Sequence, residues 1–352
     1  MTRKIWLMEG LSSQRDIIQG IQAGAGQYLH PVSVYASHRH QRHEILSLAD
    51  YALSEPADDE ERLAFILHTV RSHGIEAIHT GRNVRWFAAR REAIEASGAR
   101  LTTGAVSDEW LALADDKVAF ARHMESLNLP VVPSLRADSA SQLRELIASR
   151  PFDGLPLCVK PVQGIYGMGF WRFDDGASPM AAFSQPDSRR VQTATYLQAL
   201  EAAPESEPLV LMPWLPGPEY SVDMLVERGT VLAAVARRKE GALQHLENSG
   251  AAFELAQACA AAMQADGLVN VQTRNDHHGN PLLLEINMRP SGGIGYTRLS
   301  GVNLPALFAL RQFGLLSQQQ VMDEARQGFT PATVRALTTA VTYCPSLTNR
   351  ID

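Results

Sequence analysis

The stretch Leu282-Leu-Leu-Glu285-Ile-Asn287-Met-Arg289 is the most informative part of the sequence. Side chains alternate between two faces along a β-strand, so Glu285, Asn287 and Arg289 are expected on one face, with apolar residues on the other. Carboxylate and amide oxygens are ligands that Mg²⁺ accepts, and an arginine farther along suits a phosphate bound to that metal. A half-exposed strand with a solvated polar face is the alternative interpretation of this segment alone.

The preceding strand is predicted to provide a third oxygen ligand. Residues 268–273 and 282–287 are expected to pair as a hairpin, with the turn at residues 275–281. Gln272 lies thirteen residues before Glu285, and its side-chain oxygen would complete a metal site with Glu285 and Asn287.

A lysine followed by closely spaced glycines indicates a phosphate-binding loop. Lys160 ends a predicted buried strand, and Gly164, Gly167 and Gly169 follow it in a connection to a second strand. Glycines let backbone N–H groups approach phosphate oxygens, and a lysine adds a positive charge. Lys117, near the start of a helix predicted over residues 115–127, is a second candidate. An ordinary glycine-rich turn and a solvated lysine are the alternatives for these features taken singly.

An apolar strand that runs into a Pro/Gly turn suits an adenosine. The strand is predicted over residues 209–213, and a carboxylate follows the turn. Backbone groups near the turn would contact the adenine edge, and Glu219 would bind the ribose hydroxyls. The residues expected beside the adenine are Met212, Pro213, Trp214 and Leu215. A buried strand and turn without a ligand is the simpler interpretation of this segment in isolation.

The first part of the chain alternates short strands with amphipathic helices. Strand-like runs at residues 5–8, 31–36 and 75–80 are separated by helix-like runs at 14–21 and 60–73. This alternation predicts a doubly wound parallel α/β domain over residues 1–114. Residues 115–207 and 208–352 are expected to form two further domains, and a strand within residues 333–343 is expected to close the last one.

Composition excludes several classes of protein. The chain has 352 residues with 38 acidic and 32 basic side chains, a formal net charge of −6, which argues against a general nucleic-acid binder. Its three dispersed cysteines form neither a disulfide framework nor a zinc knuckle. The N-terminal apolar run is broken by Glu9, and no uncharged stretch approaches the roughly 18 residues that cross a bilayer. We therefore expect a cytoplasmic protein that binds neither nucleic acid nor a membrane.

These segments, in this order, resemble the ATP-grasp superfamily over about residues 115–310. The hairpin that ends in Glu285-Ile-Asn287-Met-Arg289 is most similar to the carbamoyl-phosphate-synthetase-like branch, and Trp214-Leu-Pro-Gly-Pro-Glu219 is similar to the D-alanine–D-alanine ligases. The whole chain more loosely resembles ATP-grasp proteins associated with tellurium-resistance operons. The resemblance implies an α/β N-terminal domain followed by a two-lobed α+β ATP-grasp fold that clamps ATP with one or two Mg²⁺ ions, for which Mn²⁺ could substitute.

The resemblance also implies a role for each of these residues. Lys117 and Lys160 would contact phosphates, Glu219 the ribose, and Arg289 the transferred phosphoryl group. Gln272, Glu285 and Asn287 would bind metal. Two positions depart from the pattern, because Met212 stands where many relatives have an acidic residue, and Gln272 stands where the ligases have Asp.

The residues after Arg289 are expected to take part in the reaction. Backbone donors in Ser291-Gly-Gly-Ile-Gly295 would hold acylphosphate or carboxylate oxygens if a helix begins there. Arg298 is a further catalytic candidate. The run Arg237-Arg-Lys239 either faces the phosphates or is a solvated basic run.

The activity implied is an ATP-dependent ligase that activates a carboxylate as an acylphosphate for attack by an amine or a similar nucleophile. A phosphotransferase that stops at phosphorylation, and a nucleotide-binding regulatory protein without catalysis, are the alternatives. The partners are then small molecules, a carboxylate and an amine, and a homodimer is left open. The histidine-rich run from His38 to His43 lacks metal-site spacing, and we expect it to be a solvated loop or a helix start.

Overall fold

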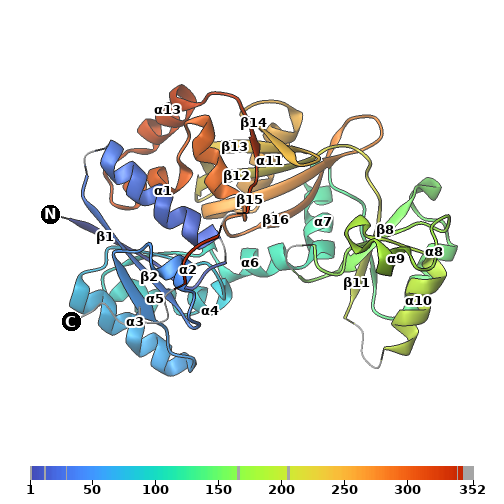
Figure 1. Cartoon of the computed structure of the whole chain (residues 1–352), viewed down its shortest axis with the longest axis horizontal. Coiled ribbons are helices and arrows are strands. Elements are labelled where there is room, and N and C mark those ends of the chain that lie inside the picture. The colour runs from blue at the N-terminus through green and yellow to red at the C-terminus, as the bar shows by residue number, and fades with distance from the viewer. Residues whose placement is uncertain are drawn as a thin grey trace. The chain divides into compact units, whose positions relative to one another are not determined.

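The computed structural model describes residues 2–11, 13–28, 30–164, 167–203, 207–338 and 340–343. The chain packs as two compact units. One comprises Met1–Leu111, Pro218–Gln272 and Ile286–Asp352, and the other comprises Ala112–Gly217 and Thr273–Glu285. Figure 1 labels the helices and strands of both units. The expected division into three domains stays a prediction about which segments fold independently.

The first unit begins with a parallel five-stranded sheet in the order β3-β2-β1-β4-β5. Helix α3 shows how the sequence delimits these elements, because Asp58 caps its first turn and Gly74 ends it in a left-handed conformation. The predicted doubly wound α/β arrangement is confirmed. The strands are β1 (Arg3–Leu7), β2 (Val32–His38), β3 (Tyr51–Ser54), β4 (Ala77–His79) and β5 (Arg100–Thr102), and the helices are α1 (Ser13–Gln27), α2 (His43–Leu46), α3 (Asp59–His73), α4 (Val84–Ala88), α5 (Arg91–Ala96) and α6 (Asp108–Asp115).

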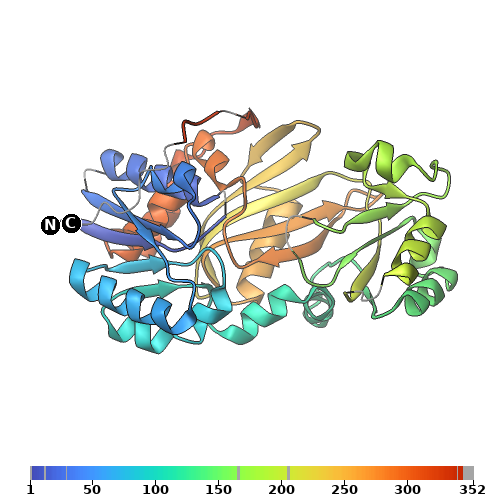
Figure 2. The same cartoon turned by 60° about the horizontal axis from the view of Figure 1, so that its bottom comes forward.

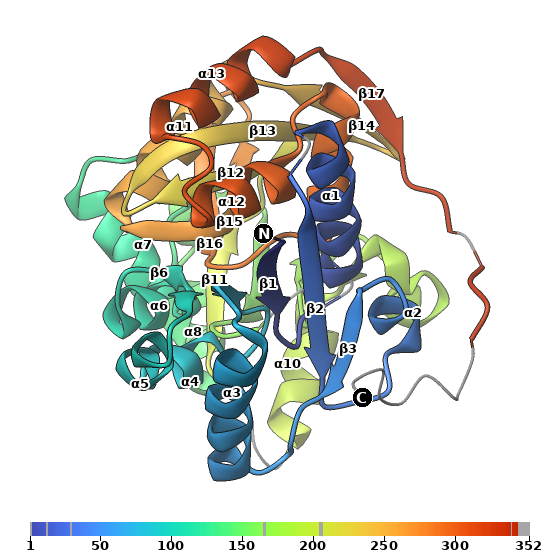
Figure 3. The same cartoon turned by 90° about the vertical axis from the view of Figure 1, so that its left-hand side faces the viewer.

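A seven-stranded sheet follows, in the order β16-β15-β12-β13-β14-β17, with β6 (Gly104–Ala105) paired to β15 off this path. Its long strands are visible in yellow and orange in Figure 2, and Figure 3 shows β17 beside β14, with which it pairs. The strands are β12 (Glu219–Glu227), β13 (Thr230–Glu240), β14 (Leu243–Glu247), β15 (Ala265–Asn275), β16 (Pro281–Asn287) and β17 (Ala332–Arg335), and the helices are α11 (Ala251–Ala262), η3 (Ile294–Ser300), α12 (Leu304–Gln312) and α13 (Gln318–Gly328).

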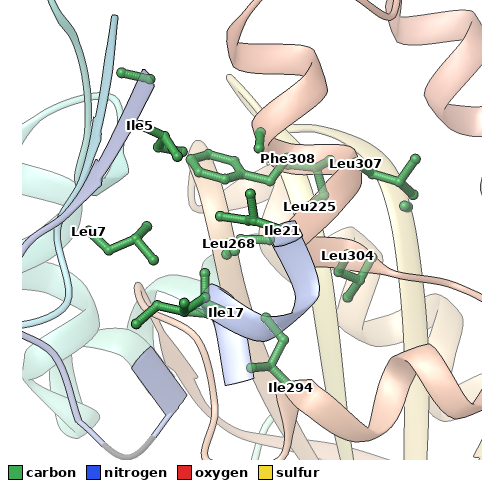
Figure 4. Close-up of a cluster of buried hydrophobic side chains, with 14 of the residues drawn as sticks. Ile5, Leu7, Ile17, Ile21, Leu225, Leu268, Ile294, Leu304, Leu307 and Phe308 are labelled. Atoms are coloured by element: carbon green, nitrogen blue, oxygen red, sulfur yellow. The ribbon is translucent and has the colours of Figure 1, made fainter. Parts of the chain in front are cut away.

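One apolar core joins these two sheets. It includes Ile5 and Leu7 from β1, Ile21 from α1, Leu225 from β12 and Phe308 from α12, all nearly inaccessible to solvent. Figure 4 shows these side chains gathered in one cluster. The N-terminal α/β layer is therefore packed onto the seven-stranded sheet by the hydrophobic effect.

Helices α1 and α12 approach each other closely because glycines of α1 face α12. A Cβ at Gly24 would lie 2.1 Å from the Cβ of Ala306, and one at Gly20 would lie 2.9 Å from the Cβ of Pro305. These glycines therefore serve helix packing, and the Ala23-Gly-Ala-Gly26 run lies inside α1.

The second unit contains a five-stranded sheet in the order β10-β9-β8-β11-β7. Antiparallel pairing of β8 with β11 places Lys160 opposite Val210 and Cys158 opposite Met212. The strands are β7 (Leu135–Ala137), β8 (Leu157–Pro161), β9 (Trp171–Phe173), β10 (Arg190–Val191) and β11 (Leu209–Pro213), and the helical segments are α7 (Lys117–Ser126), α8 (Ala140–Ala148), η1 (Phe152–Gly154), α9 (Ala181–Ser184), η2 (Pro186–Ser188) and α10 (Thr193–Ala202).

Two features of the strands differ from the sequence expectations. Strand β16 ends at Asn287 and a bend follows, so Arg289 lies beyond the strand and does not continue its polar face. Strand β14 was not expected at all.

In the described part of the chain, no helix is long and apolar enough to cross a membrane.

Candidate functional site

Lys160 and Glu285 form an ion pair within the second unit. Lys160 is the penultimate residue of β8 and Glu285 lies on β16, and their Nζ and Oε2 atoms are 3.2 Å apart. Both side chains are largely but not fully buried, with exposed fractions of 12% and 21%. The pair is therefore shielded enough for charge interactions to be strong, yet reachable by a ligand.

Lys117 is a second buried cation beside this pair. It is the first residue of α7, and its Nζ donates hydrogen bonds to the carbonyls of Val162, at 3.0 Å, and Gly164, at 3.4 Å. Burial lowers the pKa of Lys117, the positive charge of Lys160 lowers it further, and Glu285 opposes both. The alternative interpretation, a solvated lysine in a first helical turn, does not hold for Lys117, and the structure brings Lys117, Lys160 and Glu285 together.

The glycine-rich connection after β8 needs its glycines for conformation. Gly164, Gly167 and Gly169 have φ angles of +149°, +63° and +72°, which side-chain-bearing residues rarely adopt. A Cβ at Gly169 would also lie 2.7 Å from the Cδ of Pro161. The carbonyl of Gly164 accepts from Lys117, which ties the loop to the lysine cluster.

The predicted adenine segment begins in the sheet and leaves it at Trp214. The side chains of Met212 and Leu215 are buried in the apolar cluster that contains Cys158, while the indole ring of Trp214 lies under the guanidinium of Arg172, 3.7 Å from its centroid. The backbone N–H of Trp214 donates to the carbonyl of Pro156. Sequence reasoning missed Arg172, since no local signal marks a cation that stacks on a ring forty-two residues later.

Glu219 and the basic run Arg237-Arg-Lys239 belong to the first unit. The run was expected either to face the phosphates or to be solvated, and its three residues differ from one another in their surroundings. Lys239 pairs with Glu219. Arg238 pairs with Glu247 at the surface. Arg237 is buried instead of solvated, and its Nε donates to Asp223 at 2.7 Å.

The buried Arg237–Asp223 pair is the centre of a polar network. The guanidinium also donates to the hydroxyls of Ser221 and Ser291, at 2.9 and 2.8 Å, and Asp223 accepts from the amide of Asn270 at 2.9 Å. This network anchors the Ser291-Gly-Gly-Ile-Gly295 segment, within which the 3-10 helix η3 begins at Ile294.

The remaining predicted site residues also lie in the first unit. Gln272 is half-buried on β15, and Asn287 is the last residue of β16. Arg289 lies two residues beyond that strand, and its Nη1 donates to the carbonyl of Pro290 at 3.2 Å. Arg298 is exposed on η3. Burial raises the pKa of Asp16, and the charge of Arg298 opposes that rise.

The predicted metal ligands fit Mg²⁺ that arrives with a nucleotide. Among the described residues, no group of three or more His, Cys, Asp or Glu side chains could hold a metal ion. Glu285 provides the one negative charge of the predicted set, and Gln272 and Asn287 provide neutral oxygens. Magnesium is commonly bound by one or two carboxylates together with substrate phosphates and water, which is the situation this donor set suits.

A cluster of charged residues at the ends of β1 and β2 was not predicted. Glu9 is fully buried and pairs with Arg39. Burial alone would raise the pKa of Glu9, but the hydrogen bond from Arg39 and the charges of His38, Arg39 and Arg82 hold it below its ordinary value. His38 is 2% exposed, so the expectation of a solvated loop is wrong at this position, whereas the expected helix start is found at His43, the first residue of α2. The signal available in the sequence was a lone carboxylate at the end of an apolar strand.

The family and structural comparisons agree with this fold. Residues 205–339 match a family described as "ATP-grasp in the biosynthetic pathway with Ter operon". No curated protein sequence matches the chain.

Several solved structures resemble the whole chain at low sequence identity. N5-carboxyaminoimidazole synthetase from Staphylococcus aureus, complexed with ADP, has a TM-score of 0.64 and 14% identity, covering 95% of this chain and 82% of that one. L-amino acid ligase from Bacillus licheniformis has a TM-score of 0.62 and 14% identity over 94% and 78% of the two chains. Biotin carboxylase from Campylobacter jejuni has a TM-score of 0.61 and 16% identity over 90% and 73%. The chain therefore has an α/β N-terminal domain followed by the ATP-grasp fold, and its residues 205–339 are similar to an ATP-grasp family.

Proposed function

We propose that the protein is an ATP- and Mg²⁺-dependent ligase that joins a carboxylate to an amine or a similar nucleophile. The observation that carries the proposal is the Lys160–Glu285 ion pair beside the buried Lys117. Two lysines and one carboxylate lie together at low exposure, so one positive charge is not balanced within this group. Such a group suits a polyphosphate and its metal ion. The solved structures with this fold include enzymes that are named ligases, synthetases and carboxylases.

In this proposal the γ-phosphoryl group passes from ATP to a carboxylate oxygen of the substrate, which gives an acylphosphate and ADP. The nucleophile then attacks the carbonyl carbon, and inorganic phosphate leaves. The protein acts mainly by positioning the reactants and by neutralising charge.

Each residue has an assigned task within the proposal. Lys117 and Lys160 bind phosphate oxygens, with backbone N–H groups of the loop that holds Gly164, Gly167 and Gly169. Arg289 contacts the transferred group. Gln272, Glu285 and Asn287 bind the magnesium ion, which would balance phosphate charge. The adenosine is assigned to Met212, Pro213, Trp214, Leu215 and Glu219.

The test compares two lysine variants of the full chain, Lys160→Met and Lys4→Met. Lys4 is the matched control, because its Nζ also donates to a backbone carbonyl, that of His73, but it lies on β1. ADP and phosphate release is measured with defined pools of carboxylates and amines. We expect turnover that depends on both pools, a loss of about 10²–10³-fold in Lys160→Met, and no loss in Lys4→Met.

Three outcomes would contradict the ligase. The first is tight ATP binding without ADP or AMP release for any pool. The second is a stable phosphorylated product without condensation, which identifies a phosphotransferase. The third is full biological activity of Lys160→Met after its ATP hydrolysis is lost, which identifies a nucleotide-binding regulatory protein.

A further inference from the structure

The guanidinium of Arg237 links the seven-stranded sheet to the segment that follows β16. Its Nε donates to Asp223 on β12 at 2.7 Å, and its Nη1 donates to Gln244 on β14 at 2.7 Å. Its Nη2 donates to the hydroxyl of Ser221 on β12, at 2.9 Å, and to that of Ser291, at 2.8 Å. Of these four partners only Ser291 lies outside the sheet, so this contact ties the segment after β16 to the sheet.

The sheet itself does not depend on the Ser291 contact. Strands β12 and β13 pair along their length, from Glu219 opposite Lys239 to Glu227 opposite Thr230. A buried ion pair is often no more stabilising than apolar side chains of similar volume. What Arg237 adds is direction, because its planar guanidinium fixes the geometry of each hydrogen bond that it donates.

The segment after β16 passes with its backbone directly against two charged side chains. A Cβ at Gly293 would lie 2.5 Å from Nη1 of Arg237, and one at Gly295 would lie 2.6 Å from Cγ of Asp16 on α1. The side chain of Ile294, between the two glycines, is fully buried in the apolar core (Figure 4). The segment is therefore held by Arg237 on one side and by α1 on the other.

Arg289 lies between two fixed points of the backbone. On its N-terminal side, Met288 packs against Gly104, where a Cβ would lie 1.9 Å from the Met288 carbonyl oxygen. On its C-terminal side, Pro290 and Ser291 are buried, and the proline ring restricts the backbone φ angle. Fixing Ser291 therefore fixes the backbone from which the Arg289 side chain extends.

We propose that Arg237 is a positioning residue for the reaction, which acts through the Ser291 hydroxyl to hold Arg289 at the transferred phosphoryl group. The inference rests on the proposed function for the reaction and for the task of Arg289. Arg237 is only 3% exposed, so it acts on the reaction through Ser291 and not by contact with a substrate.

Two serine variants of the full chain isolate the contact. The Ser291 hydroxyl accepts from Nη2 of Arg237 and from the N–H of Gly293, and the Ser221 hydroxyl accepts from the same Nη2 and from the amide of Asn270. Both serine side chains are buried. Ser291→Ala and Ser221→Ala each remove one hydroxyl that accepts two hydrogen bonds, but only the first frees the segment after β16.

Steady-state kinetics and amide hydrogen exchange are measured on both variants. In Ser291→Ala we expect kcat to fall about ten- to hundredfold. The KM for ATP should change by less than about twofold, because the lost positioning matters in the transition state and not for ATP binding. Amide exchange in the peptide that covers residues 288–295 should become about tenfold faster. Ser221→Ala should keep the wild-type kcat and the wild-type exchange of this peptide.

A conservative change of the arginine tests the same link from its other end. Arg237→Lys keeps a positive charge beside Asp223, but an ammonium group lacks the planar fork that reaches several partners at once. We expect it to reproduce the kcat and the exchange of Ser291→Ala. The double variant should be no more than about twofold slower than the slower single variant, since both changes break one link.

Several results would overturn the inference. They are multiplied losses of kcat in the double variant, equal losses in Ser291→Ala and Ser221→Ala, and unchanged exchange of residues 288–295 in Ser291→Ala. The two serine variants decide the matter by themselves if Arg237→Lys does not fold.

This inference and the proposed function fail separately. Faster exchange in Ser291→Ala with an unchanged kcat would refute the positioning role and leave the ligase. Absence of ATP turnover by the wild-type chain with every pool of carboxylates and amines would refute the ligase, and the exchange measurements would still decide whether Arg237 holds the segment.

Discussion

Replacing Gly24 by alanine should separate helices α1 and α12. The added Cβ would lie 2.1 Å from the Cβ of Ala306, whereas non-bonded carbons rest at about 3.5–4.0 Å. The helices must therefore move apart by roughly 1.4 Å or the side chains must distort, and overpacking of this kind costs about 1–3 kcal/mol. Alanine also gains about 0.5–1 kcal/mol over glycine in a helix, which partly offsets the loss.

Gly26 provides the matched control, since it lies in the same helix and a Cβ there would meet nothing within 4 Å. Gly26→Ala is expected to be neutral or slightly stabilising. Urea unfolding followed by tryptophan fluorescence measures both variants, with the m-value checked for constancy. We expect Gly24→Ala to be less stable than Gly26→Ala by about 1–3 kcal/mol.

A double variant tests the cause directly. Gly24→Ala combined with Ala306→Gly moves the methyl group from α12 to α1, and a double-mutant cycle should show favourable coupling of about 0.5–3 kcal/mol. Equal stability of Gly24→Ala and Gly26→Ala, or strict additivity in the cycle, would refute the close-packing explanation.

Other expected outcomes concern buried titratable groups. Burial lowers the pKa of His79 to about 4, so between pH 6.5 and 4 the unfolded chain binds a proton that the folded chain does not. Stability should fall by roughly 3 kcal/mol as the pH drops through this interval, and calorimetry of His79→Leu should show a flatter profile. Burial raises the pKa of Cys158 to about 12 and that of Cys259 still further, so mass spectrometry after treatment with a thiol reagent should find both unmodified in the native protein. Arg237→Met should destabilise the chain by about 3–5 kcal/mol in urea unfolding, because Asp223 would be left as a buried unpaired charge; a loss below 1 kcal/mol would contradict this reasoning.

Local patterns were sufficient for elements that are apolar and clearly bounded. The predicted strand at residues 209–213 matches β11, and the helix-like run at residues 60–73 matches α3. Strand β14 was missed because Leu-Gln-His-Leu-Glu has no strong alternation, and pairing with β13 and β17 stabilises it.

The sequence was sufficient to identify candidate site residues, but it was not sufficient to predict their burial or their partners. The sequence marked Lys160 as a phosphate ligand and Glu285 as a metal ligand, and the structure brings the two together as an ion pair. Nothing local to Lys117 indicates that it is buried, since its acceptors are carbonyls some forty-five residues later in the chain. The meaning of Gly24 likewise depends on Ala306, which belongs to a helix near the other end of the sequence. Long-range contacts of this kind cannot be read from a single segment.

The apolar core that joins β1 and α1 to α12 has a consequence for how such chains can be recombined. A chimera that exchanged the first 111 residues for those of a relative would bring a foreign α1 against the native Pro305 and Ala306. That exchange should succeed only when the relative's counterpart of helix α12 is transplanted with it. In this protein the N-terminal layer and helix α12 therefore form one unit of exchange, and neither can be replaced without the other.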